Sequence, residues 1–411
     1  MNNPLVPVAD ALAQMLAQVS FDNQSHFVAL DQALDKVLAE PIKAAFSVPG
    51  FDNSAMDGFA LCLDDLEKEG ALTLVGEALA GHPYNKPLAK GQCVRIMTGA
   101  VVPEGADTVV MQEQADVSGE QVRFTVSPKK GDHIRRAGED ILAGSTIFDA
   151  GHRLGAVDIG LLASLGQGMV NIYKALKVAV VSTGDELRLP GSPLGKGELY
   201  DSNRFLLKAM LSRFGAEVID LGLVPDDPAK IAAAFEKAKQ EADVLITSAG
   251  MSVGSADHTR RLLEEMGDIS FWKVAIKPGK PFAFGKLGPC WFFGLPGNPV
   301  AAAVTLDQLV QPVLKKMAGE AADSVATLRA VSVDNLKKQP GRADYQRGFL
   351  YQEDGVLKVR TTGNQNSGIL SSVAKANCYI LLAQQQGKVA SGEEVLVQPF
   401  GDLLRSHAYR F

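Results

Sequence analysis

The sequence is poor in the residues that build metal and disulfide sites. Its four cysteines lie far apart and include no C-x-x-C pair, which argues against a structural zinc site, an iron–sulfur cluster or a disulfide framework. The six histidines form no i, i+4 pair of the kind that binds zinc on one helix face. We therefore expect reduced, mostly structural cysteines, and oxygen ligands for any bound metal ion.

Long apolar runs and an excess of positive charge are also missing. The first residues lack the basic segment and apolar run of a signal peptide, and no later stretch approaches the roughly 18 uninterrupted apolar residues of a membrane span. The formal net charge of −6 and the pI near 5.6 provide no overall basic field for nucleic acid or an anionic membrane. These absences predict a cytoplasmic protein that binds neither nucleic acid nor an anionic membrane. Local positive charge must then hold any anionic ligand.

The chain of 411 residues is long enough for about two to four domains. Apolar residues at helical spacing predict a first helix around residues 12–19 and a second over residues 31–38. Helical periodicity returns in residues 151–173. We therefore expect residues 1–43 and 142–175 to form one discontinuous N-terminal helical or linker domain.

Three further domains are expected along the chain. Over residues 44–141, short β-type runs such as CVRIM and VRFTV alternate with Gly, Pro, Asp and Asn turns, which predicts an inserted β-rich domain. Over residues 176–326, apolar runs such as KVAVVS and DVLITS alternate with amphipathic helices, which indicates a three-layer α/β domain with a mostly parallel sheet. Residues 327–411 read as a small C-terminal β-domain or barrel. The expected fold class is α/β plus β, in a multidomain chain.

Five loops of the α/β domain are polar and rich in Gly and Pro. Because ligands bind beyond the carboxyl ends of the strands in such sheets, these loops are expected to border one site. Their spacing matches neither a P-loop nor the glycine pattern of a dinucleotide-binding fold. The alternative is that the Gly and Pro residues only make turns. The loops are STGDE at 182–186, VPDD at 224–227, SAGMSVGSADH at 248–258, KPGKP at 277–281 and GLPGNP at 294–299.

Acidic side chains recur in three of these loops. Carboxylate oxygens, with substrate phosphates completing the shell, are what Mg²⁺ prefers. Each carboxylate also has a plainer explanation as a helix cap, and Asp227, which precedes a proline, has the pattern of a helix start. The loop carboxylates, several of which are expected to converge on one cleft, are Asp185, Glu186, Asp226, Asp227 and Asp257.

Positive charge is concentrated in the KPGKP loop. Lys277 and Lys280 flank a rigid Pro-Gly turn, which favours an anion clamp, although a plain exposed turn is the alternative. The GLPGNP loop precedes a helix whose free N–H groups could bind an anion. Its structural alternative is a rigid turn with Asn298 as N-cap.

Two glycine-bearing segments of the β-rich domain, PGFDNSAMDGFA from residue 49 and RIMTGAVVPEGAD from residue 95, could each be turns when read alone. They occur with IRRAGED, STGDEL, KPGKPFAFG, GLPGNPV and the YQRG of the tail. In this order, and over almost the whole chain, these motifs closely resemble the molybdopterin molybdenumtransferase family. That family comprises bacterial MoeA and the E domains of gephyrin and its plant counterparts.

The resemblance implies a four-domain layout and a homodimer, whose active cleft joins the α/β domain of one subunit to the β-rich domain of the other. It implies adenylylated molybdopterin and molybdate as substrates, Mo-molybdopterin and AMP as products, and Mg²⁺ as cofactor. No adenylyltransferase domain is recognised. Transient contact with a molybdopterin adenylyltransferase and with later cofactor-maturation proteins is therefore expected.

The resemblance also implies roles for individual residues. One departure from the family pattern is Ala249, which stands where a glycine is expected. The implied catalytic residues are Asp57, Thr98, Asp140 and Glu186. The implied substrate-binding residues are Asp185, Asp226, Ser252, Gly254, Asp257, Pro296, Gly297 and Pro299. The implied molybdate-binding residues are Lys277, Lys280, Arg347 and Ser367, and the implied Mg²⁺ ligands are among Asp185, Glu186, Asp226 and Asp257.

Two other functions stay open. A related adenylyltransferase would use a similar α/β domain but would have little need for the extra β-domains. A non-catalytic scaffold in the manner of gephyrin would be favoured by loss of the acidic cleft residues, and these residues are present.

Overall fold

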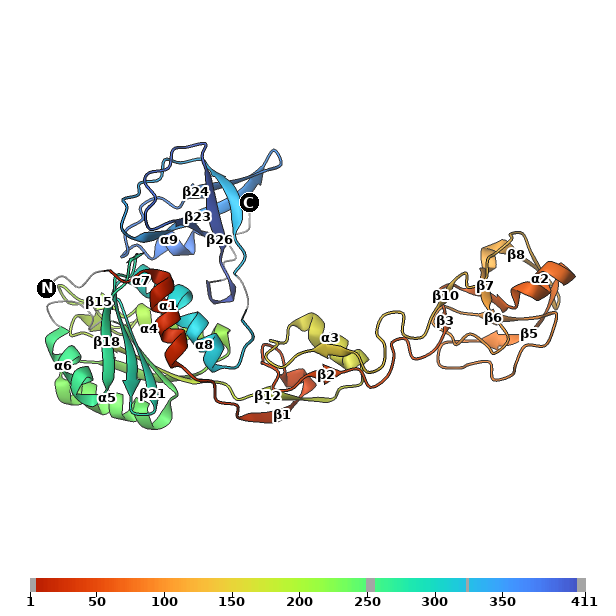
Figure 1. The fold of residues 1–411 in the computed structure, drawn as a ribbon, viewed down its shortest axis with the longest axis horizontal. Coiled ribbons are helices and arrows are strands. Elements are labelled where there is room, and N and C mark those ends of the chain that lie inside the picture. The colour runs from red at the N-terminus through yellow and green to blue at the C-terminus, as the bar shows by residue number, and fades with distance from the viewer. Residues whose placement is uncertain (1–4, 249–255, 323–324, 405–411) are drawn as a thin grey trace.

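A computed structural model describes residues 5–248, 256–322 and 325–404. The molecule is elongated: the α/β domain and the C-terminal barrel lie at one end, a linker lies in the middle, and the β-rich domain lies at the far end (Figure 1). No helix in the described part of the chain is both long and apolar enough to cross a membrane.

The α/β domain contains a six-stranded sheet in the order β16-β13-β17-β21-β20-β18, in which the first four strands are parallel and β20 runs antiparallel to both of its neighbours, β21 and β18. Both faces are buried, because Val178 and Val180 face one apolar cluster while Ala179 and Val181 face the other. This explains the continuous apolar run KVAVVS. The strands are β13 (Lys177–Thr183), β16 (Glu217–Val224), β17 (Val244–Ser248), β18 (Asp268–Lys273), β20 (Pro281–Leu287) and β21 (Cys290–Leu295).

Helices cover both faces of this sheet. Helix α4 ends where Gly215 takes a left-handed conformation with φ of 90°, which glycine adopts without strain. Asp227 is the N-cap of helix α5, and its carboxylate accepts from the amide of Ala229 at 2.9 Å, so the cap explanation of Asp227 is confirmed. The helices are α4 (Asn203–Phe214), α5 (Pro228–Glu241), α6 (Ala256–Met266), α7 (Pro299–Thr305) and α8 (Gln311–Met317), with the π-helical segment η3 (Leu306–Val310) between the last two.

The first expected helix is present as α1 (Val8–Gln18), but it packs on the α/β domain and not on the linker. Its buried residues Ala11 and Met15 join the apolar cluster that contains Met317 of α8. The backbone of Val6 also bonds to Lys273 and Ala275 beside the sheet, which holds the start of the helix against this domain.

The linker is built from antiparallel strand pairs and one helix. The predicted second helix over residues 31–38 is wrong, because only the 3-10 turn η1 (Leu30–Gln32) forms there. The amide of Leu38 instead donates to the carbonyl of His152, and its side chain is buried beside Leu154 and Ile172. The other elements are β1 (Ser25–Ala29) paired with β12 (Met169–Tyr173), β2 (Ile42–Lys43) paired with β11 (Thr146–Phe148), and α3 (Ala156–Ser164).

The distal β-rich domain is a six-stranded sheet in the order β7-β4-β6-β5-β9-β8. Its two apolar clusters lie on opposite faces, since Phe59 and Leu61 of β4 belong to one and Ala60 to the other. The elements are β4 (Gly58–Leu61), α2 (Leu63–Glu69), β5 (Leu72–Ala78), β6 (Gln92–Ile96), β7 (Thr108–Met111), η2 (Gln112–Gln114), β8 (Ala115–Ser118) and β9 (Gln121–Phe124), with β3 (Asn53–Ser54) paired to β10 (Ile134–Arg135) at its base.

The C-terminal domain is a closed five-stranded barrel, because β23 pairs with both β24 and β25 and completes the ring β23-β24-β22-β26-β25. The short strand β19 (Ile276–Lys277) leaves the α/β domain and adds to β23, so the two domains share backbone hydrogen bonds. The multidomain α/β plus β fold expected from the sequence is confirmed. The barrel elements are β22 (Leu328–Ser332), β23 (Ala343–Glu353), β24 (Val356–Thr361), α9 (Ser371–Ala374), β25 (Cys378–Leu382), β26 (Glu394–Pro399) and η4 (Asp402–Leu404).

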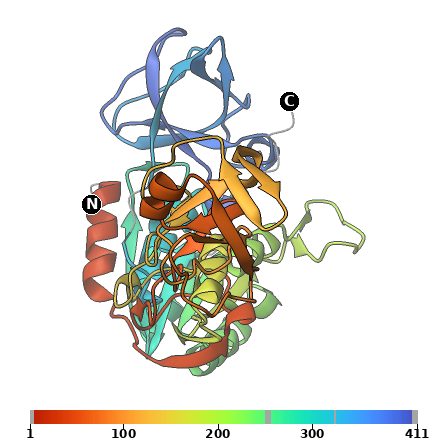
Figure 2. The same cartoon turned by 90° about the vertical axis from the view of Figure 1, so that its right-hand side faces the viewer.

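Residues 187–200 project from the α/β domain as an arm (Figure 2). Its base is formed by β14 (Leu187–Arg188) and β15 (Leu199–Tyr200), which are paired. Both strands border the cleft described below.

Candidate active site

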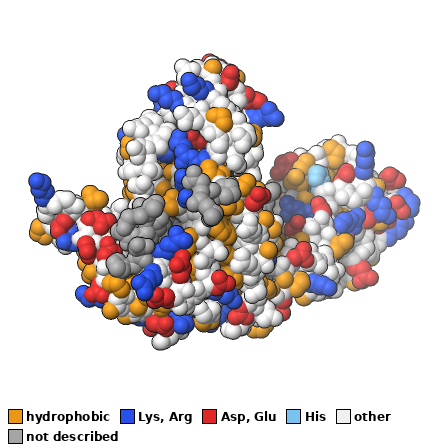
Figure 3. Space-filling view, turned by 60° about the vertical axis from the view of Figure 1, so that its left-hand side comes forward, with side chains coloured by type: hydrophobic (Ala, Val, Ile, Leu, Met, Phe, Trp, Pro, Cys, Tyr) orange, Lys and Arg blue, Asp and Glu red, His pale blue; other side chains and the backbone are white. Residues whose placement is uncertain are grey.

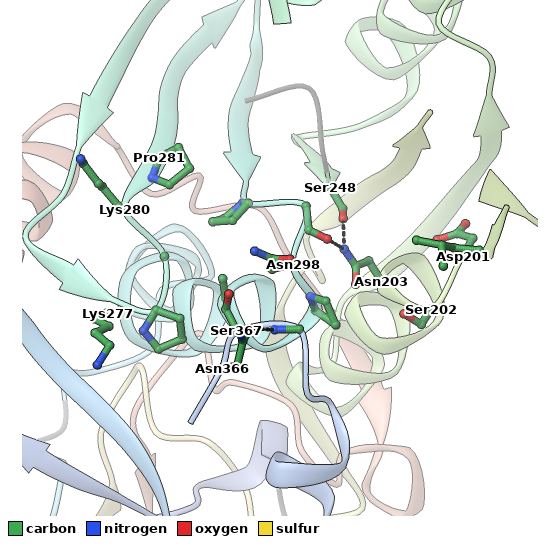
Figure 4. Close-up of a pocket in the computed structure, with 18 of the residues that line it drawn as sticks. Asp201, Ser202, Asn203, Ser248, Lys277, Lys280, Pro281, Asn298, Asn366 and Ser367 are labelled. Atoms are coloured by element: carbon green, nitrogen blue, oxygen red, sulfur yellow. Dashed lines mark hydrogen bonds between the residues drawn. The ribbon is translucent and has the colours of Figure 1, made fainter. Parts of the chain in front are cut away.

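A cleft of about 920 Å³ lies where the carboxyl ends of the parallel strands meet the C-terminal barrel. Lys277 and Lys280 lie on one side of it and Asn203 on the other, with Asn298 and Ser367 between them (Figure 4). The surface beside the junction of the two domains carries Lys and Arg side chains (Figure 3). Four of the five predicted loops contribute to the lining, through Glu186, Ser248, the KPGKP turn and the GLPGNP loop.

Asn203 holds three parts of the cleft wall together. From the start of α4, its Nδ2 donates to Ser248 Oγ at 2.6 Å and to the carbonyl of Gly297 at 2.7 Å. Nearby, Asp201 accepts from Ser182 Oγ at 3.0 Å and from Arg204 Nε at 2.8 Å. Asp201 and Asn203 were not predicted as site residues from the sequence.

The KPGKP turn has two lysines in different environments. Gly279 has a φ of 119°, and a Cβ there would lie 2.4 Å from Thr305 Cγ2, so only glycine fits this turn against α7. Lys277 Nζ donates to Asp344 Oδ2 of the barrel at 2.9 Å. Lys280 is exposed and has no carboxylate partner among the residues described. Lys280 therefore offers the less neutralised charge.

The barrel contributes Arg342 and the loop Gln365–Gly368 to the lining. Ser367 lines the cleft as expected, and its carbonyl accepts from the amide of Val300 at 3.1 Å. Arg347 does not line it: the side chain is completely buried and donates from Nε to Ser372 Oγ at 3.1 Å. Arg342, which follows the turn glycine Gly341, is half-buried and lines the cleft instead. The sequence offered one signal for Arg342 as a cleft residue: it lies beside a turn glycine, whereas Arg347 lies within a strand of the barrel.

The acidic loops form one negatively charged corner. Glu186 lines the cleft, and the amide of Asp226 donates to Asp185 Oδ1 at 3.1 Å. Burial, followed by the charges of Asp185 and Glu186, raises the pKa of Asp226. Asp257 falls in the first turn of α6, but its side chain and the whole of Ser252, Gly254 and Ala249 lie outside the described residues.

The GLPGNP loop lines the cleft through Pro296, Gly297 and Pro299. Asn298 is at the N-cap position of α7, but its side chain makes no capping hydrogen bond. The alternative in which Asn298 serves only as a helix cap is therefore not supported. Its side chain lines the cleft instead.

The remaining implied catalytic residues lie away from this cleft. Asp57 accepts from the amide of Thr98 at 2.7 Å and from its hydroxyl at 2.8 Å, and the backbone bond contributes most to lowering the pKa of Asp57. Asp140 lies where the chain leaves the distal domain, with its amide bonded to the carbonyl of Val48. Within one chain the linker separates Asp57 and Thr98 from the α/β domain (Figure 1).

Family models match three consecutive parts of the chain: the MoeA N-terminal region (domain I and II) at residues 6–166, a probable molybdopterin binding domain at residues 179–316, and the MoeA C-terminal region (domain IV) at residues 329–400. The chain is 46% identical to the molybdopterin molybdenumtransferase of Haemophilus influenzae, over 97% of this chain and 100% of that protein. It is 32% identical to that of Bacillus subtilis, over 95% and 93% of the two chains.

The likeness extends to solved structures and to a larger relative. A crystal structure of the molybdopterin biosynthesis moeA protein from Pyrococcus horikoshii OT3 superposes with a TM-score of 0.83 at 28% identity, covering 96% of this chain and 100% of that one. The gephyrin of Dictyostelium discoideum is 31% identical over 95% of this chain and 62% of its own length. From these matches and from the cleft at the predicted strand ends, we conclude that the chain belongs to the molybdopterin molybdenumtransferase family, transferases of molybdenum cofactor biosynthesis.

Proposed function

We propose that the cleft inserts molybdate into adenylylated molybdopterin with release of AMP. The observation that carries the proposal is that Lys280 of the α/β domain and Arg342 of the barrel line one cleft, and neither has a carboxylate partner in the described part of the chain. Molybdate is a tetrahedral dianion, which requires several fixed cationic and hydroxyl donors. Ser367 supplies a hydroxyl in the same lining.

The size and lining of the cleft fit a substrate larger than molybdate. A volume of about 920 Å³ is in the range of small-molecule and cofactor sites. The arm residues Leu199 and Tyr200 provide apolar surface at the side of Glu186, while Asn203 and Asn298 provide polar groups. A flat pterin joined to phosphates needs both kinds of surface.

The acidic corner fits a magnesium ion shared with the substrate. Burial, followed by the nearby charges of Asp185 and Glu186, raises the pKa of Asp226, and a divalent cation would relieve the repulsion among the three carboxylates. Residues 5–248, 256–322 and 325–404 contain no cluster of three His, Cys, Asp or Glu side chains arranged to hold a metal ion. Mg²⁺ takes much of its shell from substrate oxygens and water, so it does not require three protein ligands. The ion would neutralise charge on the phosphates when bound.

The chain's own residues would bind and orient the reactants. A molybdate oxygen or water attacks the AMP phosphorus, the phosphoanhydride bond breaks, and AMP leaves with the attacking oxygen while the pterin keeps its own phosphate. Two Mo–S bonds form as molybdate loses one oxygen, either in AMP or as water, and the two thiol protons pass to that water or to solvent. No covalent protein nucleophile is needed. Lys280, Arg342 and Ser367 would hold molybdate, while the acidic corner and Asn203 would border the pterin and phosphates.

The separation of Asp57 and Thr98 from this cleft supports a two-fold homodimer, in which the distal domain of one subunit completes the cleft of the other. We expect a molybdopterin adenylyltransferase to deliver the substrate by transient contact, and later cofactor-maturation proteins to receive the product.

The test is to incubate the purified protein with Mg²⁺, molybdate and adenylylated molybdopterin and to measure AMP. Molybdate-dependent AMP release is expected, and Arg342→Ala should raise the molybdate concentration needed for half-maximal release. A protein that instead converts ATP and free molybdopterin to the adenylylated pterin would be an adenylyltransferase, and the proposal would be wrong.

A further inference from the structure

A buried ion-pair network lies behind the acidic corner of the cleft. Arg204, in the first turn of α4, is buried and donates from Nε to Asp201 Oδ2 at 2.8 Å. Its Nη1 donates to the two carboxylate oxygens of Asp220 on β16, at 2.7 and 2.6 Å. Burial opposes the charge of Arg204, but the hydrogen bonds to the two aspartates outweigh it and raise the pKa of Arg204. One guanidinium therefore joins the start of α4 to the edge strand of the sheet.

Asp201 extends this network to the wall of the cleft. Its side chain, which is 1% exposed, also accepts from the hydroxyl of Ser182 at the end of β13, at 3.0 Å. Its amide donates to the carbonyl of Arg188 at 2.9 Å, at the base of the arm. Asp201 lines the cleft, whereas Arg204 and Asp220 do not (Figure 4). The buried network thus reaches the cleft through one carboxylate.

The base of the arm in turn holds Glu186. The amide of Leu199 on β15 donates to the carbonyl of Glu186 at 2.9 Å, and Leu187, the next residue, is paired with Leu199. The Glu186 carboxylate lies over Gly184, where an added Cβ would be 2.7 Å from Glu186 Oε2. Asp201 directly follows β15. The position of Glu186 in the acidic corner therefore depends on a strand that is anchored at Asp201.

We propose that Arg204 is a positioning residue that fixes Asp201 and, through the base of the arm, holds Glu186 where the acidic corner shares Mg²⁺ with the substrate. Arg204 itself touches neither the ion nor the substrate. Its planar fork reaches Asp201 and Asp220 at once, which a single ammonium group on a flexible stem does not reproduce. The role toward Mg²⁺ rests on the proposed function, but the clamp itself is a property of the fold.

The experiment is the Mg²⁺ dependence of AMP release by the full chain carrying Arg204→Lys, which keeps the charge but not both contacts. Loss of a residue behind a metal-binding carboxylate changes metal affinity about 10- to 100-fold. Because Arg204 acts through further residues, the Mg²⁺ concentration for half-maximal release should rise by about tenfold, the lower end of that range. The kcat at saturating Mg²⁺ should stay near wild type. The KM for molybdate should also stay unchanged, because Lys280 and Arg342 are untouched.

Two further variants test the path of the effect. Lys208→Gln removes the other cation that donates to Asp220 from the same helix, but leaves the bond between Arg204 and Asp201 in place. It is the matched control, and its Mg²⁺ dependence should be that of wild type even if its Tm falls. Asp220→Asn removes the charge at the far end of the clamp and should shift the Mg²⁺ dependence in the same direction as Arg204→Lys, by a smaller factor. It takes the place of Arg204→Lys if that variant folds poorly.

A second readout does not depend on activity. The amides of Leu199 and Asp201 make the hydrogen bonds that close the base of the arm. Their hydrogen exchange should quicken in Arg204→Lys and in Asp220→Asn, but not in Lys208→Gln. Equal quickening in Lys208→Gln would mean that the domain is loosened as a whole, and the positioning role would be wrong.

The remaining outcomes separate this inference from the proposed function. An unchanged Mg²⁺ dependence in folded Arg204→Lys, an equal shift in Lys208→Gln, or unchanged exchange at the base of the arm would each overturn the positioning role. If the wild-type protein releases AMP without Mg²⁺, or releases none, the proposed function is wrong in that part. The exchange comparison alone then decides whether Arg204 holds the base of the arm.

Discussion

Lys277 of the α/β domain and Asp344 of the barrel form an ion pair at 2.9 Å across the domain junction, beside the strand pair in which Lys277 is opposite Asp344. The carboxylate is 1% exposed and the lysine side chain 40% exposed, so the pair is buried on its acidic side only. The pair joins the two walls of the cleft. It also means that one lysine of the KPGKP turn is partly neutralised within the protein.

Removing the Asp344 charge should therefore strengthen anion binding while weakening the junction. Asp344→Asn is expected to lower the KM for molybdate by roughly threefold, the effect of one unit charge at several ångströms in a high effective dielectric, and to lower the Tm. The measurements are molybdate titration and thermal unfolding, with the exposed Asp354→Asn as control. A rise in the KM for molybdate would mean that Asp344 acts mainly by placing Lys277.

Lys280 and Arg342 should be the main cationic donors to molybdate. A charge-assisted hydrogen bond contributes about 1.5 to 3 kcal/mol, so Lys280→Ala or Arg342→Ala should each raise the KM for molybdate about 10- to 150-fold. Arg342→Lys should also be harmful, because one ammonium lacks the two-pronged planar donor. The kinetics of AMP release measure this, and Lys286→Ala, on β20 against Trp291, is the control. If all these variants keep the wild-type molybdate dependence while pterin affinity collapses, the cations hold phosphate.

Asp307 should make stability depend on pH. Burial in the π-helical segment η3 raises its pKa to about 6, from 3.8. The folded state therefore binds the proton more tightly than the unfolded state, so this group favours folding at low pH, and the contribution is lost as pH rises from about 4 to 6. Asp307→Asn should remove this slope and raise the Tm at pH 8 relative to wild type.

The test of this titration is thermal unfolding of wild type and Asp307→Asn between pH 4.5 and 8. The difference in Tm between the two proteins should grow as the pH rises from 4.5 to about 6 and then level off towards pH 8. A constant difference across the range would show that Asp307 does not titrate there, and that its bond to Gln308 decides the effect of the substitution.

A site shared between subunits predicts complementation. Homodimers of Asp57→Ala and of Glu186→Ala should each be inactive, whereas mixed dimers should recover up to about half of the wild-type activity per dimer, because one of the two clefts then has both residues intact. Mixed dimers of Glu186→Ala with Lys280→Ala are the control, since both changes lie in the α/β half and each cleft stays defective. Absence of recovery in the first pair would contradict the shared cleft.

Several features follow from local sequence alone. The run KVAVVS predicts a strand buried on both sides, and Val178 to Val181 alternate between two apolar clusters. The pattern at Asp227 and Pro228 predicts the start of α5, because the cap needs only neighbouring residues. The placement of polar loops at strand ends predicts one cleft, since parallel strands end at the same edge.

Other features depend on contacts between distant segments. The helical spacing of residues 31–38 is overruled by pairing with residues 152–172, which buries Leu38 without a helix. Nothing in the sequence distinguishes Asp344 from other acidic residues. Its role depends on the pairing of β19 with β23, which places Asp344 against Lys277. Arg342 and Arg347 of the tail have the same side-chain chemistry in the sequence.

The sequence by itself determined the family, the order of the domains and the chemical types in the cleft, because motifs, periodicity and caps are encoded within short stretches of chain. Only the tertiary structure decided which cation faces the cleft. Arg342 and Arg347 are five positions apart on one segment, but the closed barrel buries Arg347 under the loop at Asn366 and leaves Arg342 at the rim. Ring closure is a contact between strands far apart in the chain. The turn at Gly341 marks Arg342 as a residue at the end of a strand, but only the closed ring shows that Arg347 is covered.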